Sequence, residues 1–101
     1  MDLEIKKHLA SNWFKTLQHA LCDDILKIEK NKIKFRIKKW KKNIKNDEGG
    51  GEFRILKNGK VFEKVGVNFS KVYGKFPKQF QKNIPGAEKD PRYWASGISV
   101  V

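Results

Sequence analysis

Residues 54–70 read RILKNGKVFEKVGVNFS and contain the strongest local signal in the chain. Asn58-Gly59 is the dipeptide preferred in two-residue type I′ turns, and β-branched and aromatic residues lie on both sides of it. The segment is therefore expected to form an antiparallel β-hairpin. The cross-strand pairs that this turn predicts are Lys57 with Lys60, Leu56 with Val61, Ile55 with Phe62, and Arg54 with Glu63.

Under that register, apolar side chains fall on both faces of the hairpin. Leu56, Val61 and Val65 share one face, and Phe53, Ile55 and Phe62 share the other. Strands that are apolar on both faces are typical of a sheet with a layer packed on each side. The hairpin is thus expected to belong to a sheet covered on both faces.

The N-terminal residues 1–29 carry a helical pattern. Ser11 is a good N-cap for a helix over 11–29, which the segment from Leu3 to Leu9 can extend. The apolar stripe of that helix is Phe14, Leu17, Leu21, Ile25 and Ile28. His19 and Cys22 lie three residues apart, but two ligands without a third do not make a metal site. A core-facing Cys22 beside a surface His19 is therefore expected.

The period changes to two after this helix. Ile33, Phe35 and Ile37 alternate with basic residues, which predicts a strand with one buried and one cationic face, ending at Trp40. Residues 43–51 form a polar break that closes in three glycines, Gly49 to Gly51, at a spacing that fits no phosphate-binding loop.

The remaining residues continue the strand pattern. Gly66 is expected to make a bulge or bend, and Val67, Phe69 and Tyr73 continue a further strand. A short helix is expected near 77–84, and residues 93–101 are expected to form a last strand. The fold class is therefore α+β, with a helix over 1–29 and mainly strands over 33–101. Because the chain stops inside a strand, residues 1–101 are interpreted as a single incomplete domain, a truncated fragment.

Composition narrows the class of protein. The chain has 101 residues, which fits one domain, and 23 Lys+Arg against 11 Asp+Glu give a net charge of +12. No apolar run approaches the length needed to cross a bilayer. The lone Cys22 excludes an internal disulfide and agrees with a reducing compartment, so a cytoplasmic location is expected.

Most of the positive charge lies in residues 27–45, which hold ten basic side chains against Glu29 alone. Such a block is attracted to polyanions, and it is equally typical of a solvated strand face, so both interpretations stay open. Only three of the 23 basic residues are arginine, which argues against sequence-specific DNA binding. A non-enzymatic, polyanion-binding module is the alternative function that this block supports.

Three segments resemble a known family when they are taken together and in order. They are the glycine run at 49–51, the VFEK-x-GVN run from Val61 to Asn68, and Gly97-Ile98-Ser99 near the end of the chain. This combination resembles the N-terminal third of oxygen-dependent coproporphyrinogen III oxidase. Family members usually carry a fourth glycine and a following serine, where this chain has Glu48 and Phe53.

The resemblance implies an oxidoreductase of haem (porphyrin) biosynthesis. Its substrate would be coproporphyrinogen III, oxidatively decarboxylated to protoporphyrinogen IX with molecular oxygen as co-substrate. The implied fold is a large flat antiparallel sheet between helical layers, in a homodimer when full length. A divalent metal requirement is left open by the resemblance, and neither a metal site nor a bound cofactor is expected within this chain.

The resemblance also assigns residues. Ser99 matches a substrate-contacting serine, although a small residue packed in a strand would look the same. The family's His-x-Asn-x-Arg segment, with its proton donor, would follow Val101. We therefore expect no catalytic residue and no oxidase activity in residues 1–101 alone. The stretch that matches a dimer interface is Ile55, Leu56, Lys57, Asn58, Gly59, Lys60, Val61, Phe62, Glu63 and Lys64.

Overall fold

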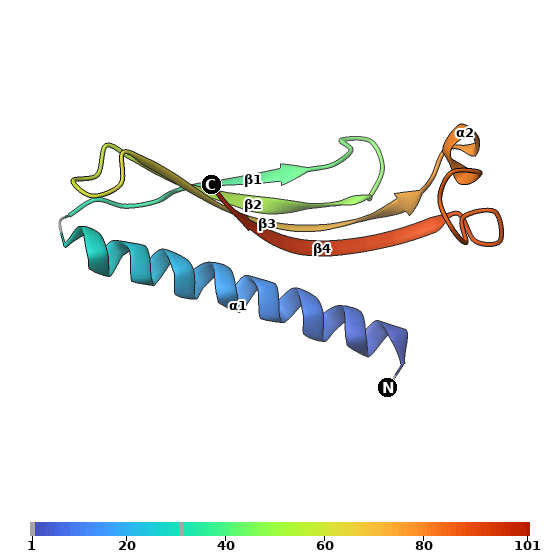
Figure 1. The fold of residues 1–101 in the computed structure, drawn as a ribbon, viewed down its shortest axis with the longest axis horizontal. Helices are drawn as coiled ribbons and strands as arrows, with labels where there is room; N and C mark the ends of the chain where they lie inside the picture. The colour runs from blue at the N-terminus through green and yellow to red at the C-terminus, as the bar shows by residue number, and fades with distance from the viewer. Residues whose placement is uncertain (1, 31) are drawn as a thin grey trace.

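The computed structural model describes residues 2–30 and 32–101. A long helix, α1 (Leu3–Glu29), lies across one face of a four-stranded antiparallel sheet (Figure 1). The strands follow chain order, β1-β2-β3-β4, and the expected α+β class is confirmed. Their bounds are β1 (Arg36–Lys41), β2 (Gly49–Lys57), β3 (Lys64–Lys75) and β4 (Arg92–Val100), with a short helix α2 (Lys78–Gln81) before β4.

Helix α1 begins earlier in the chain than a helix capped by Ser11 would. Asp2 is the N-cap, and its carboxylate accepts a hydrogen bond from the Ile5 N–H at 2.9 Å. The prediction of Ser11 as N-cap is wrong, because Ser11 lies buried inside the helix. No proline or glycine separates the two positions, so nothing stops the helix from extending to Asp2. Lys30 ends it in the left-handed conformation, at φ 53°.

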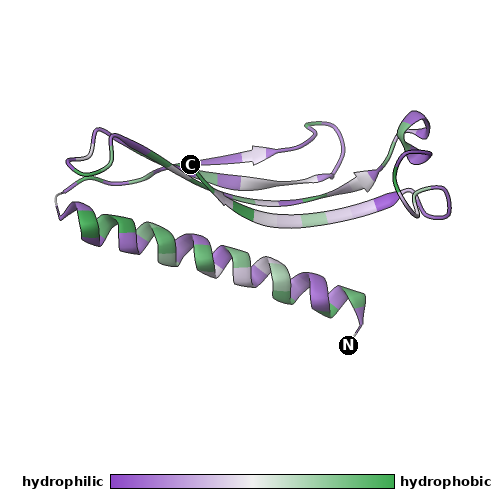
Figure 2. Cartoon of the chain, in the orientation of Figure 1, coloured by the Kyte–Doolittle hydropathy of each residue, from purple (hydrophilic) through white to green (hydrophobic). Residues whose placement is uncertain are grey.

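Hydrophilic and hydrophobic residues alternate along α1 (Figure 2), and its buried residues include the polar Ser11, Gln18 and Glu29. Of the predicted apolar stripe, Ile25 is buried but Ile28 is 51% exposed. Gln18 is almost fully buried instead, and its amide nitrogen donates to the Glu52 and Val67 carbonyls at 2.8 and 3.1 Å. Burying an amide costs little free energy when its hydrogen bonds are made. The buried stripe of α1 is therefore rotated about the helix axis relative to the apolar stripe that the sequence predicted.

The core lies between α1 and the second and third strands. Cys22 and Ile25 pack against Leu56, Val65 and Val67. Half-buried residues surround this cluster: Leu21, Leu26, Ile33, Phe35, Phe62 and Ile98. Burial raises the pKa of the Cys22 thiol, while His19 is exposed on the helix, so the expectation for this pair of residues is confirmed.

The β2–β3 hairpin forms, but the predicted register is wrong. Strand β2 pairs with β3 so that Lys57 lies opposite Lys64, and Leu56 opposite Val65. The connection is therefore a six-residue loop, 58–63, rather than a two-residue turn. It is closed by hydrogen bonds from the Asn58 N–H to the Glu63 carbonyl and from the Gly59 N–H to the Phe62 carbonyl.

A carboxylate from α1 explains the longer loop. A type I′ turn needs positive φ at both central residues, and only Asn58 of the pair has it, at 60°. Glu29 at the end of α1 accepts hydrogen bonds from the backbone N–H groups of Lys60, Val61 and Phe62 at 2.7, 3.0 and 2.6 Å. Three N–H groups are thereby satisfied by one side chain, which local sequence does not reveal. Phe62 consequently packs against the core, on the face opposite to the expected one.

The three glycines belong to β2 rather than to the polar break, which is a second correction. A Cβ atom on Gly49, Gly50 or Gly51 would lie about 2 Å from a carbonyl oxygen of a neighbouring strand. Only glycine permits that approach of the strands. Gly66 is also regular strand rather than a bulge, because the Phe53 ring occupies the space where its Cβ would lie, 2.8 Å away.

The basic strand β1 is shorter than the alternation predicted. Ile33 and Phe35 precede it and pack against the core, whereas Ile37 within it is 57% exposed. Trp40 lies inside β1 rather than at its end. The predicted division into one buried and one cationic face therefore does not hold within β1. The reason is that α1 contacts β3 and β4 and does not extend over β1.

The C-terminal elements agree with expectation. Pro77 occupies the N-cap position of α2, within the range expected for a short helix, and β4 pairs with β3 along its length. Within the described residues one face of the sheet is covered by α1 and the other is open, so a covering on both faces stays a prediction. In the part of the chain that is described, no helix is long and apolar enough to span a membrane.

Candidate functional site

Ser99 lies on the open face of the sheet, away from α1. Directly paired residues in an antiparallel sheet share a face, and successive residues alternate. Val67 is buried beneath α1, so its neighbour Asn68 points to the open face, and Ser99 is paired with Asn68. Ser99 is exposed, which leaves its hydroxyl accessible from that side.

The register aligns four residues in one row across all four strands. Lys38 pairs with Phe53, Phe53 with Asn68, and Asn68 with Ser99. The next row on the same face holds Trp40, Gly51, Ser70 and Gly97. We call these eight residues the platform.

Trp40 lies flat on the platform because the glycine beneath it has no side chain. A Cβ on Gly51 would be 2.7 Å from the Trp40 ring. The indole N–H donates to the Asn68 side-chain oxygen at 3.1 Å, which fixes the ring across β2 and β3. The Phe53 ring lies over Gly66 in the same way. Two aromatic rings and a row of small residues thus form a flat surface.

The platform combines apolar area with a few polar groups. Asn68 and Ser99 supply an amide and a hydroxyl, and Lys38 supplies a positive charge. Arg36 lies beside the platform, two residues before Lys38 on the same face of β1, and adds a second positive charge. Aromatic rings offer a surface on which a planar ring system can stack, and the polar groups beside them can orient it. The arrangement can therefore hold a flat ligand that carries anionic groups.

The segment Ile55–Lys64, which resembles a dimer interface, divides into two parts. Leu56 is fully buried and Phe62 packs against the core, so these two residues hold the fold together. The exposed members cluster at the end of the hairpin: Lys57, Asn58, Lys60, Val61, Glu63 and Lys64. Glu29 holds the loop that presents them.

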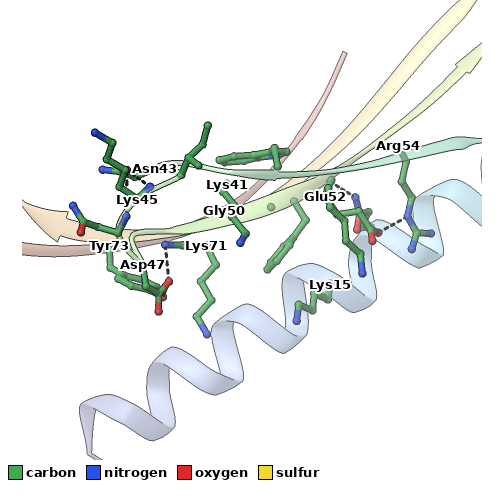
Figure 3. A pocket seen from close by; sticks show the side chains of 18 of the residues that line it. Lys15, Lys41, Asn43, Lys45, Asp47, Gly50, Glu52, Arg54, Lys71 and Tyr73 are labelled. Atoms are coloured by element: carbon green, nitrogen blue, oxygen red, sulfur yellow. Dashed lines mark hydrogen bonds and ion pairs between the residues drawn. The ribbon is translucent and has the colours of Figure 1, made fainter.

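A concave site lies on the α1 side of the sheet. A groove of about 940 Å³ separates α1 from β1 and β2 (Figure 3), and we call it the helix-side groove. Its basic lining residues are Lys15, Lys39, Lys41, Lys45, Arg54 and Lys71, and its acidic ones are Asp47 and Glu52. The sequence did not predict this groove, because the predicted strand ended at Trp40 and the alternation assigned no face to Lys39 or Lys41.

Both acidic residues of the helix-side groove are engaged. Glu52 pairs with Arg54 at 2.8 Å. Asp47 accepts a hydrogen bond from the Tyr73 hydroxyl at 2.5 Å, and this bond is the main reason why the pKa of Asp47 is lowered and that of Tyr73 raised. The Gly49 N–H and the charges of Lys41 and Lys71 also lower the pKa of Asp47.

The basic block 27–45 does not form one cationic surface. Lys39 and Lys41 face the helix-side groove, whereas Arg36 and Lys38 lie on the open face. No three His, Cys, Asp or Glu side chains within residues 2–30 and 32–101 lie together as metal ligands. Both histidines, His8 and His19, are exposed on α1.

Comparisons with known proteins agree with the family resemblance of the sequence. A sequence model of the family described as coproporphyrinogen III oxidase matches residues 9–101. The chain is 44% identical to the oxygen-dependent coproporphyrinogen-III oxidase of Rickettsia felis over 94% of its own length and 36% of that protein. It is 43% identical to the enzyme so named in Rickettsia akari over the same shares, and 41% identical to that of Rickettsia africae over 100% and 37%.

Fold and platform define an α+β protein with a four-stranded antiparallel sheet, whose face opposite α1 is open within the described residues. The chain belongs to the coproporphyrinogen III oxidase family, because the family match covers nearly all of it. It spans little more than a third of the length of the curated relatives it matches. The expected family is confirmed.

Proposed function

We propose that this chain supplies the substrate-facing sheet of an oxygen-dependent coproporphyrinogen III oxidase of haem biosynthesis. In the proposed reaction two propionate groups of coproporphyrinogen III each lose carbon dioxide and a hydride equivalent to become vinyl groups, and molecular oxygen accepts the electrons. The observation that carries the proposal is the platform row, in which Ser99 and Asn68 lie beside Phe53 and Lys38 on the open face. Family membership supports the same reaction.

Each part of the platform has a role in this proposal. The macrocycle lies against Trp40 and Phe53, and the glycines let it approach the backbone. The ammonium of Lys38 and the guanidinium of Arg36 attract propionate groups, and the Ser99 hydroxyl donates to a carboxylate or accepts from a pyrrole N–H. These residues bind and orient the substrate. Proton transfer is assigned to family residues that do not lie within residues 1–101.

The proposal includes the assembly and the location of the protein. The exposed end of the hairpin, from Lys57 to Lys64, contacts a second copy in a homodimer. The protein acts in the cytoplasm, where the substrate is soluble and the thiol of Cys22 stays reduced. A metal is not needed for the binding role proposed for the platform.

A chimera tests the proposed reaction. Residues 1–101 replace the aligned segment of the Rickettsia felis protein, and protoporphyrinogen formation from coproporphyrinogen III is measured in air. The chimera should be active, and residues 1–101 alone should be inactive. A folded chimera without activity would contradict the proposed function. Activity of the isolated chain would contradict the binding-only role of these residues.

A binding measurement tests the platform directly. The isolated chain is titrated with coproporphyrin III, the stable oxidised form of the substrate, and binding is followed by porphyrin fluorescence. Ser99→Ala should weaken binding several-fold. Ser96→Ala is the matched control, because Ser96 is in the same strand on the opposite face, where its hydroxyl donates to the Ser70 carbonyl. Equal effects of the two substitutions would remove Ser99 from the site.

A further inference from the structure

The helix-side groove has a charge surplus that the proposed oxidase reaction does not use. Six basic side chains line it against two acidic ones. Glu52 forms an ion pair with Arg54, whereas Asp47 accepts a hydrogen bond from the neutral Tyr73 hydroxyl and keeps its charge near Lys41 and Lys71, so the groove retains a surplus of four positive charges. Among the described residues, the ion pairs do not include Lys15, Lys39, Lys41 or Lys71.

The strand register brings two of these lysines to a common point. Lys41 in β1 and Lys71 in β3 are both paired with Gly50, which lies between them in β2. Their Cα atoms are therefore two strand spacings apart, roughly 10 Å. Since Gly50 has no side chain, the floor between the two ammonium groups is bare backbone.

The other two lysines approach the same space from different sides. Lys39 lies two residues before Lys41 on the same face of β1. Lys15 comes from α1, and its ammonium lies 5.5 Å from the centre of the Phe69 ring. Figure 3 shows Lys15 and Lys71 extending into the space between helix and sheet. Positive charge is thus presented from both walls of the groove.

The groove is separate from the platform. Lys39 and Lys41 are on the α1 side of the sheet, whereas Lys38, Trp40 and Ser99 are on the other. Trp40 and Gly51 border both regions, but the sheet lies between the lysines of the groove and the polar groups of the platform, so one ligand cannot contact both of these sets. A ligand of the groove is therefore distinct from the molecule that lies on the platform.

We propose that the helix-side groove binds a small soluble ligand that carries two or more linked phosphate groups. Lysine ammonium groups bind phosphate oxygens as point charges, and several of them around one space suit a ligand with several linked anionic groups. The groove's arginine, Arg54, already uses its side chain on Glu52. A groove of about 940 Å³ is the size of a site for one small ligand.

The test uses inorganic tripolyphosphate and two paired variants of the intact chain. Lys39→Ala with Lys41→Ala removes two charges from the groove. Lys78→Ala with Lys82→Ala is the control, because it removes two charges from exposed residues at α2 that lie outside both the groove and the platform, so the net charge of the two variants is equal. Isothermal titration calorimetry should show binding to the wild type, about tenfold weaker binding to the groove pair, and nearly unchanged binding to the control pair.

Several results would overturn the proposal. One is that the wild type does not bind tripolyphosphate. Another is that the two variants weaken binding equally, which would indicate a diffuse electrostatic effect. Citrate binding as tightly as tripolyphosphate would contradict the phosphate assignment. Tighter binding of a single-stranded oligonucleotide, lost equally in both variants, would indicate a nucleic-acid surface instead.

Four further readouts distinguish loss of groove binding from loss of folding and from failure of the oxidase proposal. Circular dichroism should show that both variants keep the wild-type spectrum, and a single Lys71→Ala variant should weaken tripolyphosphate binding from the neighbouring strand. The backbone amide signal of Gly50 should shift in NMR spectra on titration. Coproporphyrin III binding should be unchanged by the groove pair, so failure of either proposal can be recognised separately.

Discussion

The carboxylate of Glu29, at the end of α1, accepts a hydrogen bond from the backbone N–H of Phe62 at 2.6 Å. This contact and the two beside it join the helix to the β2–β3 loop. Gly59 is required at the same place, because a Cβ there would lie 2.2 Å from the carboxylate. The helix terminus and the hairpin end are therefore one structural unit.

Glu29→Gln should lower the melting temperature by several degrees. The amide keeps one acceptor oxygen but turns an NH₂ group toward backbone N–H donors, and the charge that strengthens the hydrogen bonds is lost. Glu63→Gln is the control, since Glu63 is exposed in the same loop. Thermal unfolding followed by circular dichroism measures both. Equal melting temperatures for wild type and Glu29→Gln would show that the loop does not depend on this carboxylate.

The same carboxylate predicts a pH dependence. Hydrogen bonds, foremost from the Phe62 N–H, lower the pKa of Glu29 below its ordinary value of 4.5. Because the folded-state pKa is lowered, its stabilising contribution is fully present above about pH 4.5 and is lost as the pH falls through the folded-state pKa. Urea unfolding from pH 7 to pH 3 should show the wild type losing its advantage over Glu29→Gln at the acidic end. A constant difference would contradict this assignment.

The hairpin register can be tested with two valines. Val65→Ala should lower the free energy of unfolding by about 2 kcal/mol, because Val65 is buried opposite Leu56. Val61→Ala should change it by less than about 0.5 kcal/mol, because Val61 is 59% exposed in the loop. Chemical denaturation measures both changes. The opposite order would support the two-residue turn instead.

Gly50→Ala tests the close approach of β1 and β2. The added Cβ would lie 2.1 Å from the Trp40 carbonyl oxygen, so the strands must separate, at a cost of about 2 kcal/mol or more. Gly86→Ala is the comparison, because its φ of 84° is strained for alanine but no atom lies within 4 Å. A smaller loss, about 1 kcal/mol, is expected there. Hydrogen exchange of the β1 amides should rise in Gly50→Ala alone.

Local sequence was sufficient to predict a helix or strand wherever the structure depends on residues within that element alone. The apolar spacing of the first 29 residues predicts a helix, and the alternation in 54–57, 67–73 and 93–101 predicts strands, because backbone period and side-chain burial are coupled over a few residues. The buried thiol of Cys22 and the short helix after Pro77 follow from equally local rules. The family could also be recognised, since it depends on motif order alone.

The sites required more than local rules. The platform row from Lys38 to Ser99 spans four strands, and the helix-side groove adds Lys15 from α1 to lysines of two strands. The sequence shows which residues alternate, but the partner of each residue depends on the register. An error of register in the hairpin therefore placed Val61 and Phe62 wrongly.

The sequence by itself determined the fold class, the family and the identity of the strands, because these depend on periodicity and motif order. The tertiary structure decided the hairpin register and the place of the glycine run. The physical reason lies in contacts between distant residues. Glu29 satisfies three N–H groups of a loop more than 30 positions away, and Gly50 is required by the backbone of a neighbouring strand. Such contacts exist only once helix and sheet have packed together.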